Sequence, residues 1–432
     1  MGMESLWQHH TKLPAFESLK RDIKTDVLVI GSGLAGLMTA YKLTKEGVDC
    51  VLVEKERICS KTTAHTTAKV TAQHGLIYHK IMKSYGEDYA KAYYEANQSA
   101  AESLIDLCGN AGCKTEIKDN FVYSTDKYEI DKELEALERI GVPFIYEEDV
   151  PLPLKTSGAI GFKNQAQFNP MELAKYISVG LRIYENTRVT EMIGTTAVTE
   201  VGKIKAKKVV VATHFPFINK HGSYFLKLYQ HRSYILALEN AKEFNEMYVD
   251  NDKKGMSFSH FGGVLLLGGG GHRTGKKGGN FKELSDFKDR HYPHSKEVFR
   301  WAAQDTISLD GIPYIGNYSK ITPDLYVSTG FNKWGMTSSM LGAEIICSDI
   351  LGKPKEYAEV FSPSRCIIKP QLFINGCESI KNLVTPTTKR CPHLGCALKY
   401  NPTEHSWDCP CHGSRFDEEG RVLDGPANGN MK

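Results

Sequence analysis

The chain has 432 residues, 41% of them hydrophobic and 24% charged, which excludes wholesale disorder and allows two or three domains at about 150 residues each. Lysine and arginine (54) exceed aspartate and glutamate (51) by only three, which gives no reason to expect a nucleic-acid partner. No apolar run approaches the roughly 18 residues of a membrane span, and the N-terminus has no signal sequence, so we expect no transmembrane segment and a cytoplasmic location.

The first elements predicted along the chain form a β-α-β unit. Residues 26–31 are predicted to be a buried strand, the apolar residues that follow have helical spacing, and residues 51–54 form a second strand. This order is typical of the start of a parallel sheet in an α/β protein. Further along we expect helices over 88–108, 130–139 and 171–183, strands over 209–212 and 264–267, and a linker over 353–365.

A glycine-rich turn joins the first strand to its helix. Gly31, Gly33 and Gly36 form G-x-G-x-x-G, and Glu54 ends the next strand 18 residues after Gly36. In a nucleotide site these glycines allow a tight turn, a close approach to a pyrophosphate and close helix packing, and the acidic residue accepts a ribose hydroxyl. The alternative is a glycine-rich turn without a ligand, and the motif alone does not choose between FAD and NAD.

A second set of motifs lies in the last tenth of the chain, which holds four of the 11 cysteines. One loop contains Cys-x-His and the other Cys-x-x-His, and each has one additional cysteine. Two cysteines and two histidines can hold zinc, but Cys-x-His is not the usual zinc-finger spacing, and the surplus thiols argue against zinc. The six residues are Cys391, His393 and Cys396 in the first loop and Cys409, Cys411 and His412 in the second.

Several passages of the large N-terminal part follow the glycine motif in a fixed order. They are Ser60-Lys61-Thr62-Thr63-Ala64-His65, Val209-Val210-Val211-Ala212-Thr213-His214, Asp310-Gly311-Ile312-Pro313-Tyr314-Ile315-Gly316, Ser328-Thr329-Gly330-Phe331 and Gly335-Met336. With them, residues 25–350 resemble the D-amino-acid oxidase-like family of FAD-dependent oxidoreductases, except that His214 replaces a glycine. The resemblance implies FAD and an α/β fold over 1–352, in which a Rossmann-like FAD-binding domain carries an inserted mixed-sheet substrate domain. The implied FAD-binding parts are 25–75, 160–220 and 300–350, with the substrate part between them.

The same resemblance assigns flavin contacts to individual residues. It implies that Thr62 and Thr63 face the phosphates and ribityl chain, and that Val189 contacts the adenine. Gly335-Met336-Thr337 begins a helix whose small residues and positive N-terminal end would lie at the N1/C2=O edge of the ring and stabilise reduced flavin. A helix that merely packs on its neighbour is the alternative.

The two cysteine-rich loops resemble those of the Rieske [2Fe-2S] family, in the branch with a disulfide between its loops. The resemblance implies that Cys391 and Cys409 bind one iron and that His393 and His412 bind the other. It also implies a disulfide between the two surplus thiols, although such bonds are rare in the cytoplasm. The implied disulfide partners are Cys396 and Cys411.

Two departures from the Rieske pattern lead to further expectations. Phe416 stands where high-potential members have a tyrosine that donates a hydrogen bond to a ligand sulfur, so we expect a lower reduction potential. Only about 25 residues precede the first ligand within the tail, 366–432, and they do not resemble strands. We therefore expect a small, abbreviated all-β cluster domain that leans on the flavin domain.

Residues that contact the substrate are harder to predict. No Ser/His/Asp triad or carboxylate pair stands out, and hydride transfer to flavin requires neither. Lys333 and Trp334 directly precede the glycine expected at the ring, which makes them catalytic candidates. Arg273 could clamp a carboxylate with two hydrogen bonds, or lie on the surface after its run of glycines. Other candidates on the expected flavin face are Arg232, Tyr234, His260, His272 and, unless it is a core histidine, His65.

The combination of centres predicts a redox enzyme. A flavin accepts a hydride, and a [2Fe-2S] cluster exchanges single electrons. We expect one FAD and one cluster in an oxidoreductase that oxidises a small amine- or amino-acid-like substrate and passes electrons singly to an external acceptor such as ferredoxin or quinone. The alternative is an electron carrier or reductase in which the cluster feeds the flavin and no amine is oxidised.

Overall fold

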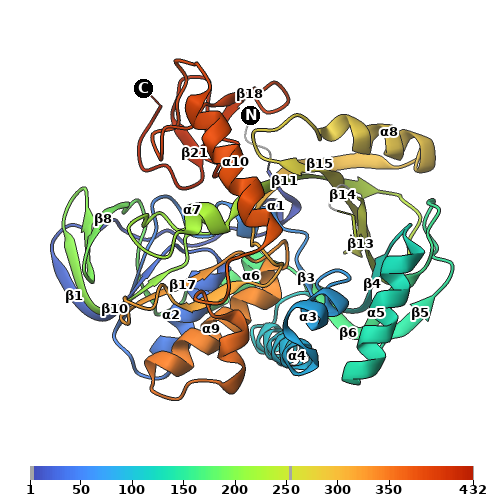
Figure 1. Cartoon of the computed structure of the whole chain (residues 1–432), viewed down its shortest axis with the longest axis horizontal. Helices are drawn as coiled ribbons and strands as arrows, with labels where there is room; N and C mark the ends of the chain where they lie inside the picture. Colours follow the sequence, from blue (N-terminus) through green and yellow to red (C-terminus); the bar gives the residue numbers. More distant parts are fainter. Residues whose placement is uncertain (1–3, 253–254, 432) are drawn as a thin grey trace.

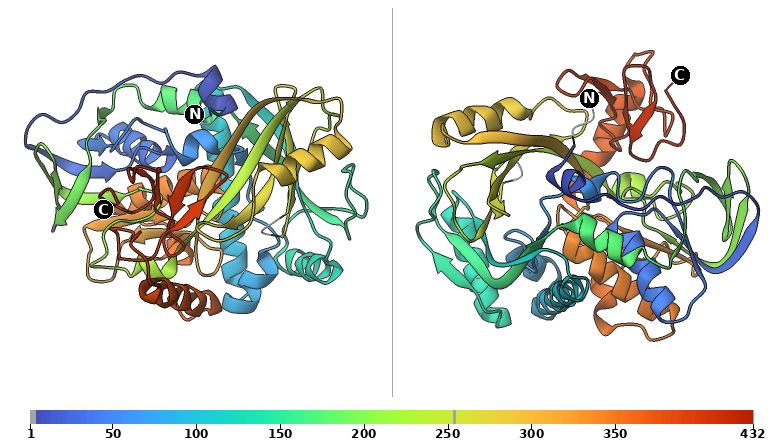
Figure 2. Two further views of the ribbon diagram at one scale, coloured as in Figure 1. Left: turned by 90° about the horizontal axis from the view of Figure 1, so that it is seen from above. Right: turned by 180° about the vertical axis from the view of Figure 1, so that it is seen from behind.

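The computed structural model describes residues 4–252 and 255–431. Two large sheets form two lobes, and a C-terminal domain (residues 370–431) lies over their junction (Figure 1). The view from above in Figure 2 shows the same domain, in red, lying across both lobes. Within the described ranges, no helix combines the length and apolar character needed to cross a bilayer.

The first lobe is built on a mostly parallel sheet. The predicted β-α-β unit is confirmed by β1 (Ile23–Ile30), α2 (Leu34–Lys45) and β2 (Cys50–Val53), and β1 also pairs in parallel with β10 (Lys203–Val211). These strands are apolar on both faces because each face is covered: α2 and α9 (Gly335–Ile350) pack on one, and a second cluster that includes Phe215 and Tyr318 packs on the other. The remaining strands are β17 (Leu325–Thr329), β16 (Tyr314–Asn317), β7 (Arg182–Tyr184), β8 (Val189–Ile193) and β9 (Thr196–Thr199).

The second lobe is a mixed sheet, as predicted for the substrate domain. Most of its neighbouring strands are antiparallel, whereas β12 (Met247–Asp250) pairs in parallel with β4 (Thr115–Tyr123). The other strands are β15 (Lys296–Ile307), β11 (Tyr229–Glu239), β14 (Val264–Arg273), β13 (Ser257–Phe261), β6 (Ala159–Phe168), β5 (Ile145–Glu147) and β3 (Lys69–Val70).

Helices surround the two sheets. The three helices predicted in the middle of the chain are confirmed as α4 (Glu87–Asn110), α5 (Lys127–Ile140) and α6 (Pro170–Ile177). The last ends before residue 183 because the chain enters β7 at Arg182. The remaining helices of the lobes are α1 (Leu6–His10), η1 (Thr62–His65), α3 (Tyr78–Tyr85), α7 (Tyr224–Lys227) and α8 (Phe281–His291).

The C-terminal domain begins with a helix. The segment that did not resemble strands is α10 (Pro370–Val384), and a small antiparallel sheet follows it, as expected for an abbreviated all-β domain. The predicted linker contains η2 (Glu356–Phe361) and is pinned by buried Arg365, whose guanidinium donates to the Asp310 carboxylate at 2.7 Å. The strands of the small sheet are β18 (Lys399–Asn401), β19 (Ser406–Asp408), β20 (Arg415–Phe416) and β21 (Val422–Asp424).

Candidate flavin and cluster sites

A cavity of about 890 Å³ lies where the two lobes and the C-terminal domain meet. This volume is near the upper end of the range for ligand pockets, roughly 300–1,000 Å³. The first lobe contributes Gly31 and Gly33, the second contributes Ile235 and Gly269, and residues 424–428 come from the C-terminal domain. All three parts of the chain therefore form one chamber.

The glycine turn has the geometry that the motif predicts. Gly31 has a φ of +99°, and a Cβ there would lie 2.7 Å from the carbonyl oxygen of Ala212, while a Cβ on Gly36 would lie 1.8 Å from that of Gly31. These two glycines therefore serve close packing, and Gly33 lines the cavity. Glu54, also in the wall, is held by the Ser32 amide, which donates to its Oε2 at 2.9 Å.

The other predicted flavin contacts divide into two groups. Thr337 is not among the described residues of the wall, because its hydroxyl donates to the carbonyl of Thr71 at 2.9 Å and accepts the Thr71 amide. Gly36 is likewise absent from that wall. The predicted residues that do line the cavity are Thr62, Thr63, Val189, Gly335 and Met336.

Several residues of the wall have buried polar atoms without a hydrogen-bond partner among the described residues. Two of these atoms are His214 Nε2 and Ser60 Oγ. His214 has a φ of +66°, so it adopts the left-handed backbone suited to the glycine it replaces. An extended cavity, a glycine turn at a helix start and unsatisfied polar atoms together fit a dinucleotide such as FAD.

Lys333 and Trp334 lie in the cavity wall, in a strained turn before α9. Asn332 and Lys333 both have left-handed backbones, with φ of 53° and 75°. Trp334 stacks on His74 with ring centroids 5.2 Å apart, and Tyr93 and Thr71 hold the two ring nitrogens of His74. Burial lowers the pKa of His74 to about 3, so this supporting imidazole is neutral.

Asp305 is a cavity residue that the sequence analysis missed. It lies on β15 opposite His231 of β11 and lines the cavity. Burial raises the pKa of its carboxyl, and the charges of Lys333 and His214 partly oppose this effect. The alternation of side chains along β15 could have placed Asp305 on one face, but not at a cavity.

The remaining candidates face elsewhere or play other parts. The Arg273 guanidinium does not line the cavity but donates to the carbonyl of Pro410 at 3.1 Å and to Asn375 Oδ1 at 3.0 Å, since β14 ends at the second cysteine loop. Arg273 therefore binds the C-terminal domain and does not face the cavity. Tyr234 and His65 line the cavity, whereas Arg232, His260 and His272 are outside its described wall.

The two cysteine-rich loops are matching tight turns. The Gly395 amide donates to the carbonyl of Cys391, and the Gly413 amide to that of Cys409, both at 2.9 Å. The turns bring His393 and His412 together, with their Nδ1 atoms 3.3 Å apart. Two imidazole nitrogens that converge on one point suit a shared iron.

The sulfur side of the site is compact. The Sγ atoms of Cys396, Cys409 and Cys411 all lie within 4.8 Å of one another, and Cys391 is also buried. All 11 cysteines are free thiols in the structure, so the disulfide between Cys396 and Cys411 is not formed and stays a prediction. The buried thiols and converging imidazoles fit a Rieske-type [2Fe-2S] cluster.

The outer nitrogens of both histidines point to residues 213–228, which follow β10. His412 Nε2 lies 3.1 Å from the carbonyl oxygen of Phe225, and His393 Nε2 lies 3.0 Å from Asn219 Oδ1. Since both partners are acceptors, each Nε2 carries the proton and each Nδ1 is left to bind metal. Burial lowers the pKa of His393 to about 4 and that of His412 to about 3, which keeps both rings neutral.

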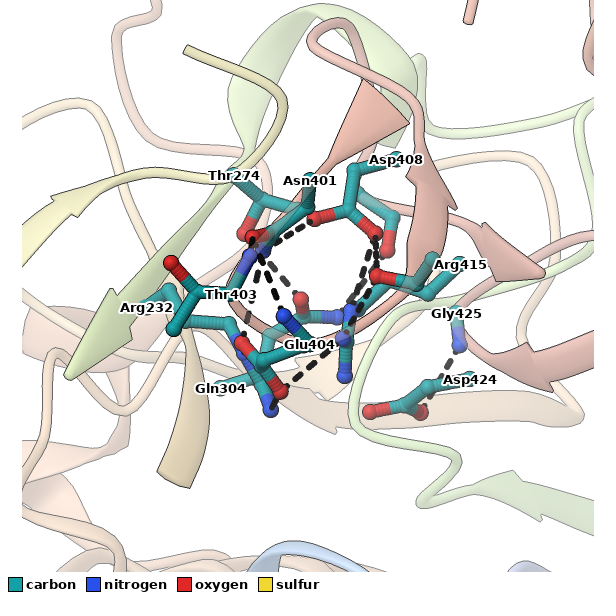
Figure 3. Close-up of polar contacts among 12 residues, drawn as sticks. Arg232, Thr274, Gln304, Asn401, Thr403, Glu404, Asp408, Arg415, Asp424 and Gly425 are labelled. Atoms are coloured by element: carbon teal, nitrogen blue, oxygen red, sulfur yellow. Dashed lines mark hydrogen bonds and ion pairs between the residues drawn. The ribbon is translucent and has the colours of Figure 1, made fainter. Parts of the chain in front are cut away.

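A buried ionic network attaches the C-terminal domain to the second lobe (Figure 3). Glu404 accepts hydrogen bonds from Arg232 Nε at 2.6 Å and from Arg415 Nη2 at 2.9 Å, and Arg415 also donates to Asp408. We call Arg232, Glu404, Arg415 and Asp408 the latch. Burial alone would raise the pKa of Glu404, but the opposite charges of the Arg232 and Arg415 guanidiniums have the larger effect and lower it to about 2.

Comparison with known families agrees with this geometry. Residues 26–348 match the family model "FAD dependent oxidoreductase". The chain belongs to this family. Residues 371–432 match the model of the Rieske [2Fe-2S] domain, so the FAD-dependent oxidoreductase carries a C-terminal Rieske domain, and the two matches imply FAD and a [2Fe-2S] cluster.

Individual relatives support both parts of this FAD-dependent oxidoreductase. One relative is YhfW of Bacillus subtilis (strain 168), whose name describes it as a Rieske 2Fe-2S iron-sulfur protein. It is 32% identical to this chain, and the match covers 98% of this chain and 96% of YhfW. A solved structure of L-proline dehydrogenase from P. horikoshii has a TM-score of 0.67 and 19% identity, covering 80% of this chain and 98% of its own. The solved structure of glycine oxidase from Geobacillus kaustophilus has a TM-score of 0.66 and 18% identity. The match covers 80% of this chain and 99% of that one. At these identities the solved structures establish the fold alone.

Proposed function

We propose that this oxidoreductase oxidises a small amine- or amino-acid-like substrate and delivers the electrons one at a time to an external acceptor. Bound FAD supplies hydride acceptance, and a bound [2Fe-2S] cluster supplies one-electron exchange. The observation that carries the proposal is the placement of His393 and His412. Their outer nitrogens bond to Asn219 and Phe225, while residues 424–428 of the same domain close the flavin cavity.

The residues of the chain have distinct parts in this scheme. Gly33 admits the cofactor's pyrophosphate, Gly31 allows the tight turn that places it there, and Glu54 holds that turn. Asp305 offers a carboxylate to a substrate ammonium group, and Trp334, which stacks on His74, forms an apolar part of the same cavity wall. Cys391, His393, Cys409 and His412 are proposed to hold the cluster, with Cys396 and Cys411 as the flanking pair.

The test is an anaerobic screen of the holoprotein. Amines, amino acids and NAD(P)H are added in turn, flavin bleaching is followed by absorbance, and the cluster is followed by EPR. We expect an amine or amino acid to bleach the flavin and to produce the reduced Rieske signal. In a Cys409→Ser variant the same substrate should still bleach the flavin without that signal.

Two results would contradict the proposal. If no amine or amino acid bleaches the flavin, but a reduced ferredoxin or a quinol reduces the cluster and then the flavin, the protein is a carrier or reductase. If the metal proves to be a single tetrahedral Zn²⁺, no relay exists.

A further inference from the structure

An unusual share of the exposed apolar surface lies on one stretch of the chain. Of the 17 large hydrophobic side chains exposed in the described residues, seven lie between residues 368 and 394. A surface helix normally turns its apolar residues toward the core, and a contiguous exposed apolar patch marks an interaction site. We call these seven residues the apolar stripe: Ile368, Phe373, Ile374, Ile380, Leu383, Val384 and Leu394.

Helix α10, which carries most of the stripe, is attached by its polar side. Its two buried side chains are Asn375 and Asn382, at 1% and 2% exposure. The Asn375 side chain donates to the carbonyl of Leu226 at 3.0 Å, and the backbone carbonyl of Asn382 accepts the Ala397 amide at 2.9 Å. Hydrogen bonds therefore fix the orientation of the helix, and this orientation turns Phe373, Ile380 and their neighbours to solvent.

The stripe continues onto the first cluster loop. Leu394 directly follows His393 and is 38% exposed. A Cβ on Gly395 would lie 3.8 Å from the Leu383 side chain, so the loop and the end of α10 are in contact. A partner seated on the stripe thus lies beside the cluster, on a side that the lobes leave open.

The charges around the stripe are mostly positive. Residues 366–400 contain five lysines and arginines but only one acidic residue, Glu378. Glu378 is already paired with Lys276, while Lys381 and Arg390 are exposed. An apolar centre with a basic rim complements a surface with an apolar centre and acidic rim.

We propose that the apolar stripe is the docking surface for an acidic one-electron carrier protein. This inference rests on the proposed function, which requires an external one-electron partner, and it names the class of that partner. The exchange moves one electron between the carrier's metal centre and the cluster, with no bond or proton transferred. Electrostatic attraction by the basic rim would guide the encounter, and burial of the stripe would hold the complex.

The experiment uses reduced plant-type ferredoxin as the probe, since its potential lies below the Rieske range and one-electron reduction of the oxidised cluster is downhill. The holoprotein is mixed with ferredoxin under anaerobic conditions, and the second-order rate of cluster reduction is measured against salt concentration. The test variant is Ile380→Glu/Val384→Glu. Its matched control, Ile193→Glu/Val201→Glu, makes the same substitutions at positions of 60% and 64% exposure on β8 and after β9, outside the stripe.

We expect a rate that falls with salt and that drops about tenfold or more in the stripe variant but stays unchanged in the control. A Lys381→Glu variant should lower the rate and weaken its salt dependence. Equal melting temperatures and an unchanged Rieske EPR signal in all variants will show that folding and cluster loading are intact.

Three results would overturn the inference. One is equal reduction of the wild type and the stripe variant. Another is binding to anionic phosphatidylserine vesicles that the stripe variant loses, which would make the surface a membrane contact. The third is a dimer that the stripe variant dissociates. A holoprotein without a Rieske signal would instead defeat the proposed function, so the two failures are distinguishable.

Discussion

At the scale of single residues, Asp305 links the cavity to the charge of the substrate. Burial raises the pKa of its carboxyl, so the negative charge is lost at a higher pH than for an ordinary aspartate, whose pKa is about 3.9. The affinity for a cationic amine should therefore fall as the pH drops through this raised pKa. We expect Asp305→Asn to weaken binding about tenfold or more and to abolish this acid limb. Dissociation constants from flavin absorbance changes across pH test this. A variant with the wild-type pH profile would remove Asp305 from the substrate site.

Phe416 gives a second prediction at this scale. Its side chain is fully buried in β20, two residues after Ser414 in the second cluster loop. Phe416→Tyr would place a phenol donor beside the cluster, and a hydrogen bond to a ligand sulfur stabilises the reduced, more negative state. We expect a higher reduction potential in an EPR-monitored titration. Phe416→Leu, which adds no donor, is the control, and a fall in potential in the tyrosine variant would contradict the prediction.

The residues that could be predicted from the sequence are those whose chemistry depends on local spacing. The glycines of residues 31–36 act within one turn, and each loop histidine lies within three residues of its proposed ligand cysteine, so the local motif carries much of the geometry. Asp305 and Asn219 could not be predicted, because their roles depend on strand register and on contact between domains. The spacing around Arg273 likewise did not indicate which neighbour its guanidinium would meet.

At the scale of elements, the latch joins β11 of the second lobe to the small sheet of the Rieske domain. The Glu404 side chain is 3% exposed and lies between two arginines, and its pKa of about 2 is below the unfolded value of about 4.3. A depressed pKa stabilises the fold at pH values above the unfolded pKa, and this stability is lost as the pH falls from about 4.3 toward 2.

We expect Glu404→Gln to lower the free energy of unfolding by about 3–5 kcal/mol near neutral pH, because two buried guanidiniums lose their counter-charge. The variant should also lose the acid-dependent part of the wild-type stability. Thermal melts at pH 7 and at about pH 2.5, near the lower end of this range, measure both effects. The control is Glu418→Gln, since Glu418 is 53% exposed and its loss should be nearly neutral. Equal melting temperatures for Glu404→Gln and wild type would contradict the role of the latch.

Elements with regular apolar patterns were predictable. Strand β1, helix α2 and strand β2 follow from short buried runs separated by a glycine turn, because burial on both faces leaves continuous apolar residues. Helix α10 was missed as an element, and its orientation could not have been inferred. Its apolar residues face solvent and its asparagines face the protein, the reverse of the rule that links periodicity to burial.

At the scale of the whole molecule, the Rieske domain closes the flavin cavity and is fixed to both lobes. Residues 424–428 line the cavity. Gln304, which donates to the Gly413 carbonyl at 3.0 Å, and the latch hold the domain on the second lobe, and Arg188 of the first lobe donates to the Asn428 carbonyl at 3.2 Å. A Cβ on Gly413 would lie 2.2 Å from the Gln230 side chain, so the loop touches β11 directly. We therefore expect electron exchange between the two sites to occur without movement of the domain.

This arrangement predicts how the internal electron transfer responds to solvent. In a domain that must swing between positions, the rate is limited by motion and falls as viscosity rises. With the latch closed, we expect the rate from reduced flavin to cluster to be independent of added sucrose. Flash reduction of the flavin under anaerobic conditions, followed by cluster absorbance, gives this rate directly. Glu404→Gln, with the latch opened, should become viscosity-dependent, whereas Glu418→Gln should not. A wild-type rate that falls in proportion to viscosity would show that the Rieske domain moves during turnover.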